Sequence, residues 1–131
     1  MSYLLLDTRA RDTAFVYWWQ NGETFSWLEG GQVSDVLRLI QKYRSVLSES
    51  LEGVAVVAGP GRFSAIRVGV LTAHLLARWY HVPLFAVSCE EAATESGRQE
   101  LFQEIANHCR TESAYVSPLY DREPNITTPR V

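Results

Sequence analysis

The residues best suited to chemistry form a glycine-rich turn, Gly59-Pro60-Gly61-Arg62, between a short apolar run and a helical pattern. In an open α/β sheet, a turn between a strand and a helix presents free backbone N–H groups and the positive end of the helix dipole. Such a turn is either a binding loop or a tight reversal that needs glycine for unusual backbone angles. It lacks the Gly-Lys-Ser/Thr of a P-loop and the third glycine of a dinucleotide fingerprint, and Pro60 has no N–H to offer a phosphate. We therefore assign the turn to neither phosphate motif.

The other side chains with catalytic potential have no evident activating residue. Ser64, Ser88 and Cys89 are candidate nucleophiles, but the sequence places no histidine to activate them. Glu90 and Glu91 are adjacent, so on a helix they point in different directions and do not form an obvious acid–base pair. We expect no catalytic residue among them.

The cysteines and histidines show no metal-binding pattern. Cys89 and Cys109 lack Cys-x-x-Cys spacing, and His74, His81 and His108 have no metal-ligand spacing with them. Free cysteines tend to lie inside proteins. We expect two buried thiols, no metal and no cofactor, and we interpret His74 as a solvated or interface side chain.

The elements that position the glycine turn read as a βαβ unit. Val54–Ala58 is a short apolar strand, Ser64–Tyr80 has a helical pattern, and Leu84–Ser88 is a further strand. A strand, a crossover helix and a second strand imply parallel pairing in an α/β fold.

The N-terminal part reads as a three-stranded antiparallel unit, so the sheet as a whole is predicted to be mixed. Tyr3–Leu6 is apolar, and Thr13–Trp19 is β-branched and aromatic. Asn21-Gly22 then separates this run from the alternating Thr24–Trp27, which is the strongest short hairpin signal.

Three further helical segments are expected. Ser34 could cap a helix that runs to about Leu47 and whose apolar stripe, from Val33 onward, is wider than one core contact needs. A short helical piece spans Glu90–Glu95, and a break follows at Gly97. An amphipathic helix then spans Arg98–Cys109, with Leu101, Phe102, Ile105, Ala106 and Cys109 on one side.

The helix over Ser64–Tyr80 has two opposed apolar faces, which predicts burial on both sides. Arg67, His74 and Arg78 form a polar ridge between them. Because both long helices offer more apolar surface than one sheet face can cover, we expect a protein–protein interface. The face with small residues allows close helix approach, so we predict that it meets the partner and that the other face lies on the sheet. The first face carries Ile66, Gly69, Val70, Ala73, Leu76, Ala77 and Tyr80, and the second carries Val68, Leu71, Leu75 and Trp79.

Composition indicates one globular domain. The chain has 131 residues, 47% of them apolar and 21% charged, with a net charge of −3. This charge argues against a domain that grips nucleic acid by its own basic face, although a local basic patch is not excluded. Leu4-Leu5-Leu6 is too short for a signal sequence or a membrane span, so we expect a cytoplasmic protein with no membrane contact.

The order of these elements and several motifs resemble the TsaB family, also called YeaZ. The resemblance is carried by Asp7-Thr8 after the first strand, by the motif from Gly59 through Arg67 to Gly69, by Pro83–Ser88 and by the tail Pro118–Thr127. It covers residues 3–92 and, less closely, the tail. It implies a ribonuclease H-like lobe of the actin-like ATPase fold.

The chain departs from the family in two ways. The family usually has Ser at the position of Arg62, Thr at Ser64 and Gly at Ala65, and the added arginine changes the charge of the turn. Family members also carry a second lobe after the segment that ends near Ala92, whereas here only a short stretch precedes the last helix. We therefore expect residues 1–116 to form one actin-like lobe and residues 117–131 to form an extended, Pro-containing tail.

The missing lobe bears on nucleotide binding. In the actin-like superfamily the nucleotide lies between two lobes, each of which supplies a phosphate loop. Asp7 matches the first of these loops, but one lobe cannot enclose a nucleotide. We expect Asp7 to serve a turn instead, and we carry over no catalytic or ATP-binding residue.

The resemblance implies a non-catalytic subunit that pairs with TsaD through Val33–Leu47 and Ser64–Tyr80 and supports threonylcarbamoyl transfer to the adenosine beside the anticodon of tRNA. It also implies contact with TsaE, a homodimer in isolation, and contact with tRNA only through the complex. Two alternatives stay open, a self-associating structural or regulatory homodimer outside the tRNA pathway and a small hydrolase or protease. The predicted interface residues are Val36, Leu37, Ile40, Tyr43, Leu47, Ile66, Gly69, Val70, Ala73 and Ala77.

Overall fold

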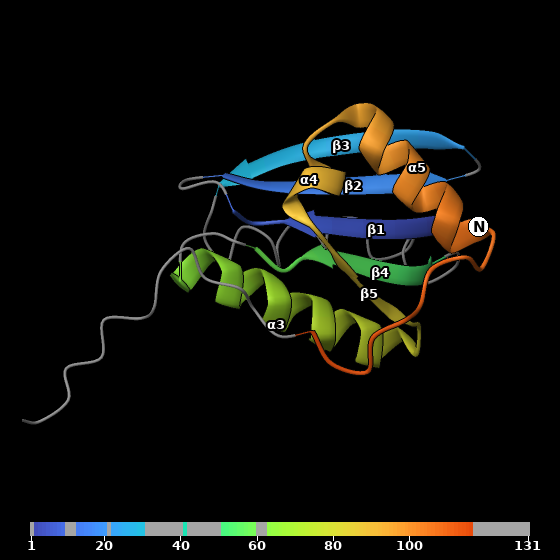
Figure 1. The fold of residues 1–131 in the computed structure, drawn as a ribbon. Helices are drawn as coiled ribbons and strands as arrows, with labels where there is room; N and C mark the ends of the chain where they lie inside the picture. The colour runs from blue at the N-terminus through green and yellow to red at the C-terminus, as the bar shows by residue number, and fades with distance from the viewer. Residues whose placement is uncertain are drawn as a thin grey trace, which may run out of the picture.

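The computed structural model describes residues 2–9, 13–20, 22–30, 41, 51–59 and 63–116 of the chain. Within these residues, five strands form one sheet with the order β3-β2-β1-β4-β5. Figure 1 shows this sheet with helices on both of its faces. The elements are β1 (Ser2–Asp7), β2 (Thr13–Gln20), β3 (Glu23–Gly30), β4 (Leu51–Val57), α3 (Phe63–Tyr80), β5 (Leu84–Val87), α4 (Cys89–Ala92) and α5 (Glu95–Ala106).

The first three strands form the predicted antiparallel unit. β1 pairs with β2, and β2 pairs with β3 in a register that sets Gln20 opposite Glu23. Gly22 lies between these two residues at a φ of 89°, which glycine adopts without strain. The Asn21-Gly22 hairpin prediction is confirmed, because a two-residue turn with positive φ matches the twist of the strands that it joins.

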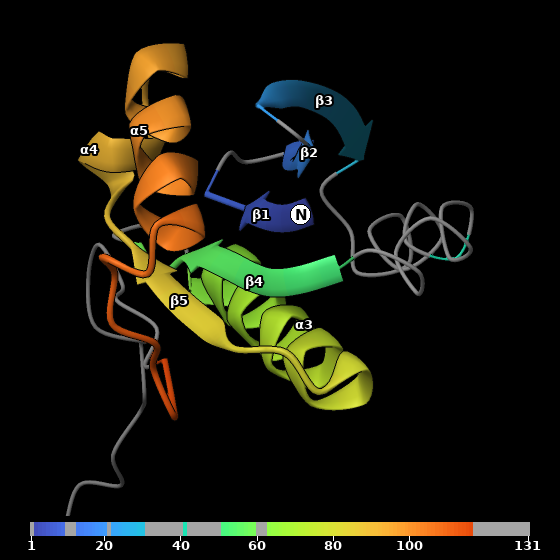
Figure 2. The ribbon, with the colours of Figure 1, turned by 90° about the vertical axis from the view of Figure 1, so that its right-hand side faces the viewer.

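The second half of the sheet is the predicted βαβ unit. β4 pairs in parallel with β1 on one side and with β5 on the other, and α3 is the crossover between β4 and β5. Figure 2 shows α3 on one side of the sheet and α4 and α5 on the other. The mixed α/β sheet predicted from the sequence is therefore confirmed.

The central strands are buried on both faces, which explains their uninterrupted apolar runs. Leu4 and Leu6 point toward α3, whereas Leu5 points toward α5. On the α5 side, Phe102 stacks on Trp19 with ring centroids 6.0 Å apart. The core on the α3 side includes Val16, Trp18, Val54, Val56, Ile66, Val70, Ala73, Leu76, Ala77 and Val116, and the other core includes Tyr3, Tyr17, Val57, Phe85, Val87, Leu101 and Ile105.

Two details of the C-terminal helices correct the sequence analysis. The predicted break at Gly97 is wrong, because Gly97 lies in the first turn of α5, where its N–H donates to the Oγ1 of the N-cap Thr94 at 3.0 Å. A Cβ at Gly97 would lie 2.5 Å from the carbonyl oxygen of Glu91, so glycine here permits close packing of α4 on α5. The prediction of two buried thiols is also wrong. Cys109 lies beyond the end of α5 and is exposed, and Cys89 is half-buried.

After α5, residues 107–116 return past β5 to α3, as Figures 1 and 2 show, and we call this segment the strap. Among the described residues, no helix is long and apolar enough to cross a bilayer. Several predictions fall outside these residues. They concern the helix around Val33–Leu47 with Val36, Leu37, Ile40, Tyr43 and Leu47, the turn residues Pro60, Gly61 and Arg62, and the tail 117–131.

Candidate functional site

The outward face of α3 carries three of the four exposed large apolar side chains among the described residues. Leu71 and Leu75 are each 57% exposed and Trp79 is 73% exposed. They lie four residues apart, so their side chains follow one another along successive turns on one face. We call these three residues the α3 stripe.

The structure reverses the predicted orientation of α3. The face with Ile66, Val70 and Ala73 is buried in the core against the sheet, and the face that was predicted to lie on the sheet carries the exposed α3 stripe. The small residues were predicted to allow close approach of a partner helix, but in the structure this face packs against the chain's own sheet and the loop after β1. Ala77 is likewise buried.

Gly69 shows why small residues face inward. A Cβ at this position would overlap Thr8 Oγ1 and lie 2.9 Å from Thr8 Cγ2. Thr8 follows β1 and is itself 5% exposed. The loop after β1 therefore packs directly against the backbone of α3.

The polar ridge of α3 has a partner that the sequence did not reveal. His74 Nε2 lies 3.0 Å from the Val116 nitrogen and 3.2 Å from the Val116 carbonyl oxygen, so it accepts from the N–H in one tautomer and donates to the carbonyl in the other. Its ring lies 4.9 Å from the ring of Tyr115. Arg67 and Arg78 on the same ridge are exposed. The partners come from the strap, some forty residues later, so no local pattern could have found them. Beside this contact lies an open groove of about 790 Å³ whose lining includes His74, Leu75, Arg78, Glu112 and Ser113.

A second candidate site lies at the carboxyl ends of the parallel strands, where open α/β sheets bind ligands. Gly59, two residues after the end of β4, has a φ of 119°, which explains the requirement for glycine there. Gly59 lines an open pocket of about 400 Å³, together with Ala58 and residues 86–90. The rest of the glycine turn lies outside the described residues.

Asp7 at this edge is held by its own loop. Its carboxylate accepts hydrogen bonds from the backbone N–H of Arg9 at 3.2 Å, from Arg9 Nε at 2.9 Å and from an Arg9 Nη at 2.8 Å. The bond to the backbone two residues ahead is the turn role predicted for this acid. The pKa of Arg9 is raised, chiefly by the hydrogen bond to Asp7. Both carboxylate oxygens are thus occupied by a fork of donors.

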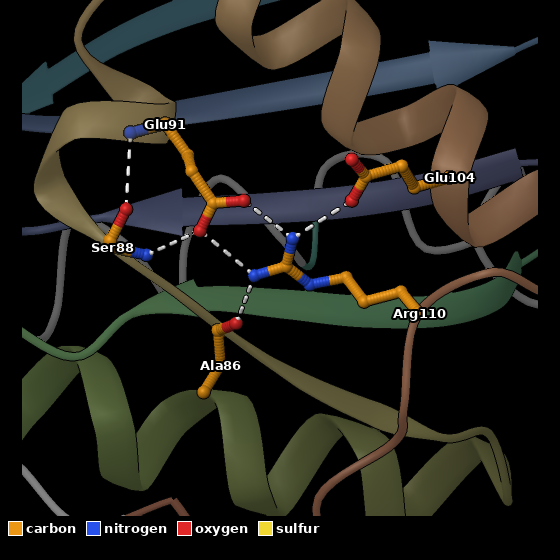
Figure 3. A network of polar contacts seen from close by, with 5 residues as sticks. All are labelled: Ala86, Ser88, Glu91, Glu104 and Arg110. Carbon is orange, nitrogen blue, oxygen red and sulfur yellow. Dashed lines mark hydrogen bonds and ion pairs between the residues drawn. The ribbon is translucent and has the colours of Figure 1, made fainter.

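A network of polar contacts ties the strap to α4, α5 and β5 (Figure 3). Arg110 donates to both carboxylate oxygens of Glu91, at 2.5 and 2.9 Å, and to the Ala86 carbonyl oxygen at 2.6 Å, and it lies 3.3 Å from Glu104 Oε2. Glu91 also accepts the Ser88 N–H at 3.0 Å, while its own N–H donates to Ser88 Oγ at 3.2 Å. This reciprocal pair is a capping box for α4. Glu91, for which the sequence indicated no acid–base partner, therefore has a structural role, because it attaches the strap to α4.

Arg110 lowers the pKa of Glu91 from 4.5 to about 2, through its hydrogen bond first, with the Ser88 N–H helping and burial opposing. Because the pKa falls on folding, the stabilisation is complete above about pH 4.5 and is lost as the pH falls toward 2. Arg110→Ala is expected to reduce the free energy of unfolding at pH 7 by about 1 kcal/mol, a value held down by the partial exposure of Glu91. In urea titrations at pH 7, 4 and 2.5, the Arg110→Ala variant should lose less unfolding free energy on acidification than the wild type does. Glu100→Ala, at an exposed carboxylate of α5, is the control and should leave the pH dependence unchanged.

The candidate nucleophiles and metal ligands remain dispersed. Ser88 caps α4, and Cys89 opens that four-residue helix. The side chain of Ser64 lies outside the described ones. Within the described part of the chain, no three His, Cys, Asp or Glu side chains gather in a way that could hold a metal ion.

Comparison with known proteins gives a consistent result. The family model for TsaD, tRNA N6-adenosine threonylcarbamoyltransferase, matches residues 33–108. Among solved structures, YeaZ from Pseudomonas aeruginosa is 26% identical with a TM-score of 0.55, covering 67% of this chain and 45% of its own. A Pseudomonas aeruginosa protein with similarity to the peptidase YEAZ is also 26% identical, with a TM-score of 0.54 and coverage of 66% and 43%. No curated protein sequence matches the chain.

The chain thus spans less than half the length of either of these structures. The predicted resemblance to YeaZ and the predicted actin-like fold are confirmed over the matched part.

Proposed function

Because this chain belongs to the tRNA N6-adenosine threonylcarbamoyltransferase family, we propose that it is an accessory subunit of the machinery that places threonylcarbamoyl on the adenosine beside the anticodon of tRNA. The family match and the YeaZ-like fold support a role in tRNA modification. In the finer proposal, the chain performs no chemistry and acts by pairing with TsaD. TsaE and a cytoplasmic location belong to the same proposal.

The observation that carries the pairing is the α3 stripe. Single exposed apolar side chains are common on protein surfaces, but Leu71, Leu75 and Trp79 form a row. A tryptophan that is 73% exposed at the end of such a row resembles the aromatic anchors that dominate protein–protein interfaces. The stripe is therefore the surface that we assign to the partner.

The choice of TsaD as partner rests on the family match. The matched residues 33–108 include the whole of α3, so TsaD carries a counterpart of this helix in a lobe built in the same way. Two related lobes can pair about a pseudo-two-fold axis through corresponding helices, as identical subunits do in a two-fold dimer. The net charge of −3 supports the proposal that this chain reaches tRNA only through the complex.

The direct test is to mix this chain with TsaD and measure molar mass by light scattering coupled to size exclusion. A species with the summed mass of both proteins supports the proposal. Two separate peaks at micromolar concentration overturn it. A stable homodimer that persists in the presence of TsaD would favour the alternative of a self-associating module.

The hydrolase alternative has its own test. If a purified preparation hydrolyses a peptide or ester substrate, replacing both Ser64 and Cys89 by alanine should abolish the activity if either is the nucleophile. Unchanged hydrolysis removes both residues from consideration. The half-buried position of Cys89 at the start of α4 does not favour this alternative.

A further inference from the structure

A fourth exposed apolar side chain lies outside α3 but next to it. Among the described residues, Leu71, Leu75, Trp79 and Tyr115 are the large apolar side chains that are most exposed, and Tyr115 is 71% exposed. It belongs to the strap, which reaches α3 from the far side of the sheet (Figures 1 and 2). Tyrosine, tryptophan and arginine are the residues enriched at binding hot spots.

The strap holds Tyr115 in place from both sides. Before it, Arg110 is tied to Glu91 and Ala86, and the Ser113 N–H donates to the Leu84 carbonyl oxygen of β5 at 2.7 Å. After it, Val116 is 3% exposed in the core on the α3 side. A side chain between two anchored neighbours loses less conformational freedom on binding than one in a free loop.

His74 makes the last of these attachments. Its Nε2 lies 3.0 Å from the Val116 nitrogen and 3.2 Å from the Val116 carbonyl oxygen, so either tautomer can hydrogen-bond to this residue, and its ring lies 4.9 Å from that of Tyr115 at an interplanar angle of 30°. His74 stands three residues after Leu71 and directly before Leu75 on α3. Leu75 and Ala114 line the same groove as His74. Tyr115 thus adjoins the α3 stripe, with the His74 ring between them.

We propose that Tyr115 is a second anchor of the surface that binds TsaD, and that His74 is the positioning residue that presents it. This inference rests on the proposed function and extends it from one helix to a composite surface of α3 and the strap. The strap also connects this surface to α4 and α5, through the ion pairs of Arg110 with Glu91 and Glu104.

The test is the dissociation constant for TsaD, measured by titration with full-length variants of this chain. Tyr115→Ala is expected to weaken binding about 30-fold, the lower end of the range for a hot-spot residue. His74→Ala should weaken it by a similar factor, and the double variant should be no weaker than either single one, because both changes remove the same anchor. His74→Gln, whose side-chain oxygen can still accept the Val116 N–H, should recover part of the affinity.

Two controls separate this role from a purely structural one. Tyr115→Phe keeps the ring and should bind as wild type, and Glu100→Ala on α5 should have no effect. Additive losses for His74→Ala and Tyr115→Ala would overturn the positioning role. Wild-type affinity for Tyr115→Ala, alongside lost affinity for a charge in the α3 stripe, would overturn this inference and leave the proposed function standing. Absence of binding by the wild-type chain would overturn both.

Discussion

Leu75→Glu is expected to weaken binding of this chain to TsaD by about 100-fold or more. The substitution would place a carboxylate at the centre of the α3 stripe, where docking would strip it of water without offering it a partner. In the free chain the same carboxylate stays solvated, because Leu75 is 57% exposed. The effect should therefore appear in the dissociation constant and not in the fold.

The matched control is Gln103→Glu, which adds the same charge to an exposed position of α5 on the opposite face of the sheet. It should bind TsaD with wild-type affinity. Urea unfolding should place both variants within about 0.5 kcal/mol of wild type, as expected for surface substitutions. If Leu75→Glu kept its affinity while remaining folded, the α3 stripe would not be the docking surface.

Gly69→Ala is expected to lower the free energy of unfolding by about 2–3 kcal/mol, the scale of overpacking in a tight core. At an ordinary helix position the same change would stabilise by about 1 kcal/mol, because alanine has the higher helix propensity. Here the new Cβ would overlap the buried Thr8 side chain, which is β-branched and has little freedom to turn away. The sign of the measured change thus distinguishes packing from propensity.

A double-mutant cycle provides the control. Thr8→Ala removes the two atoms nearest to the new Cβ, so the double variant should be less destabilised than the sum of the two single variants by about 1–2 kcal/mol. Additive losses of unfolding free energy in urea titrations would mean that the Thr8 side chain is not what makes a Cβ at position 69 unfavourable. Far-UV circular dichroism should confirm that all three variants remain helical.

Local features of the sequence predicted the strands and the crossover well. Asn21-Gly22 is a specific signal for a hairpin because few residue pairs adopt this turn. The apolar run Val54–Ala58 indicates a strand buried on both faces, because such a strand has no polar side. The start of α5 was missed at Gly97. Glycine usually breaks a helix, but here Gly97 lies in a first turn capped by Thr94, and the close packing of α4 leaves no room for a Cβ.

The orientation of α3 could not be predicted from periodicity. The pattern shows two apolar faces but carries no information on which one meets the sheet. That face is identified by contacts between distant parts of the chain, such as that of Gly69 with Thr8. The contacts of His74 with the strap and of Arg110 with Glu91 also join distant segments, so spacing could not reveal them.

Four features follow from the residues alone: the α/β class, the hairpin, the parallel crossover and the two apolar faces on the helix after the glycine turn. Each of these depends on neighbouring residues, through backbone preference or the period of one element. The packed fold is needed to show which face of α3 stays exposed, that Arg110 pairs with Glu91, and that Tyr115 stands beside the α3 stripe. Such choices depend on contacts between elements, whose free energies arise only when the sheet, its helices and the strap pack together.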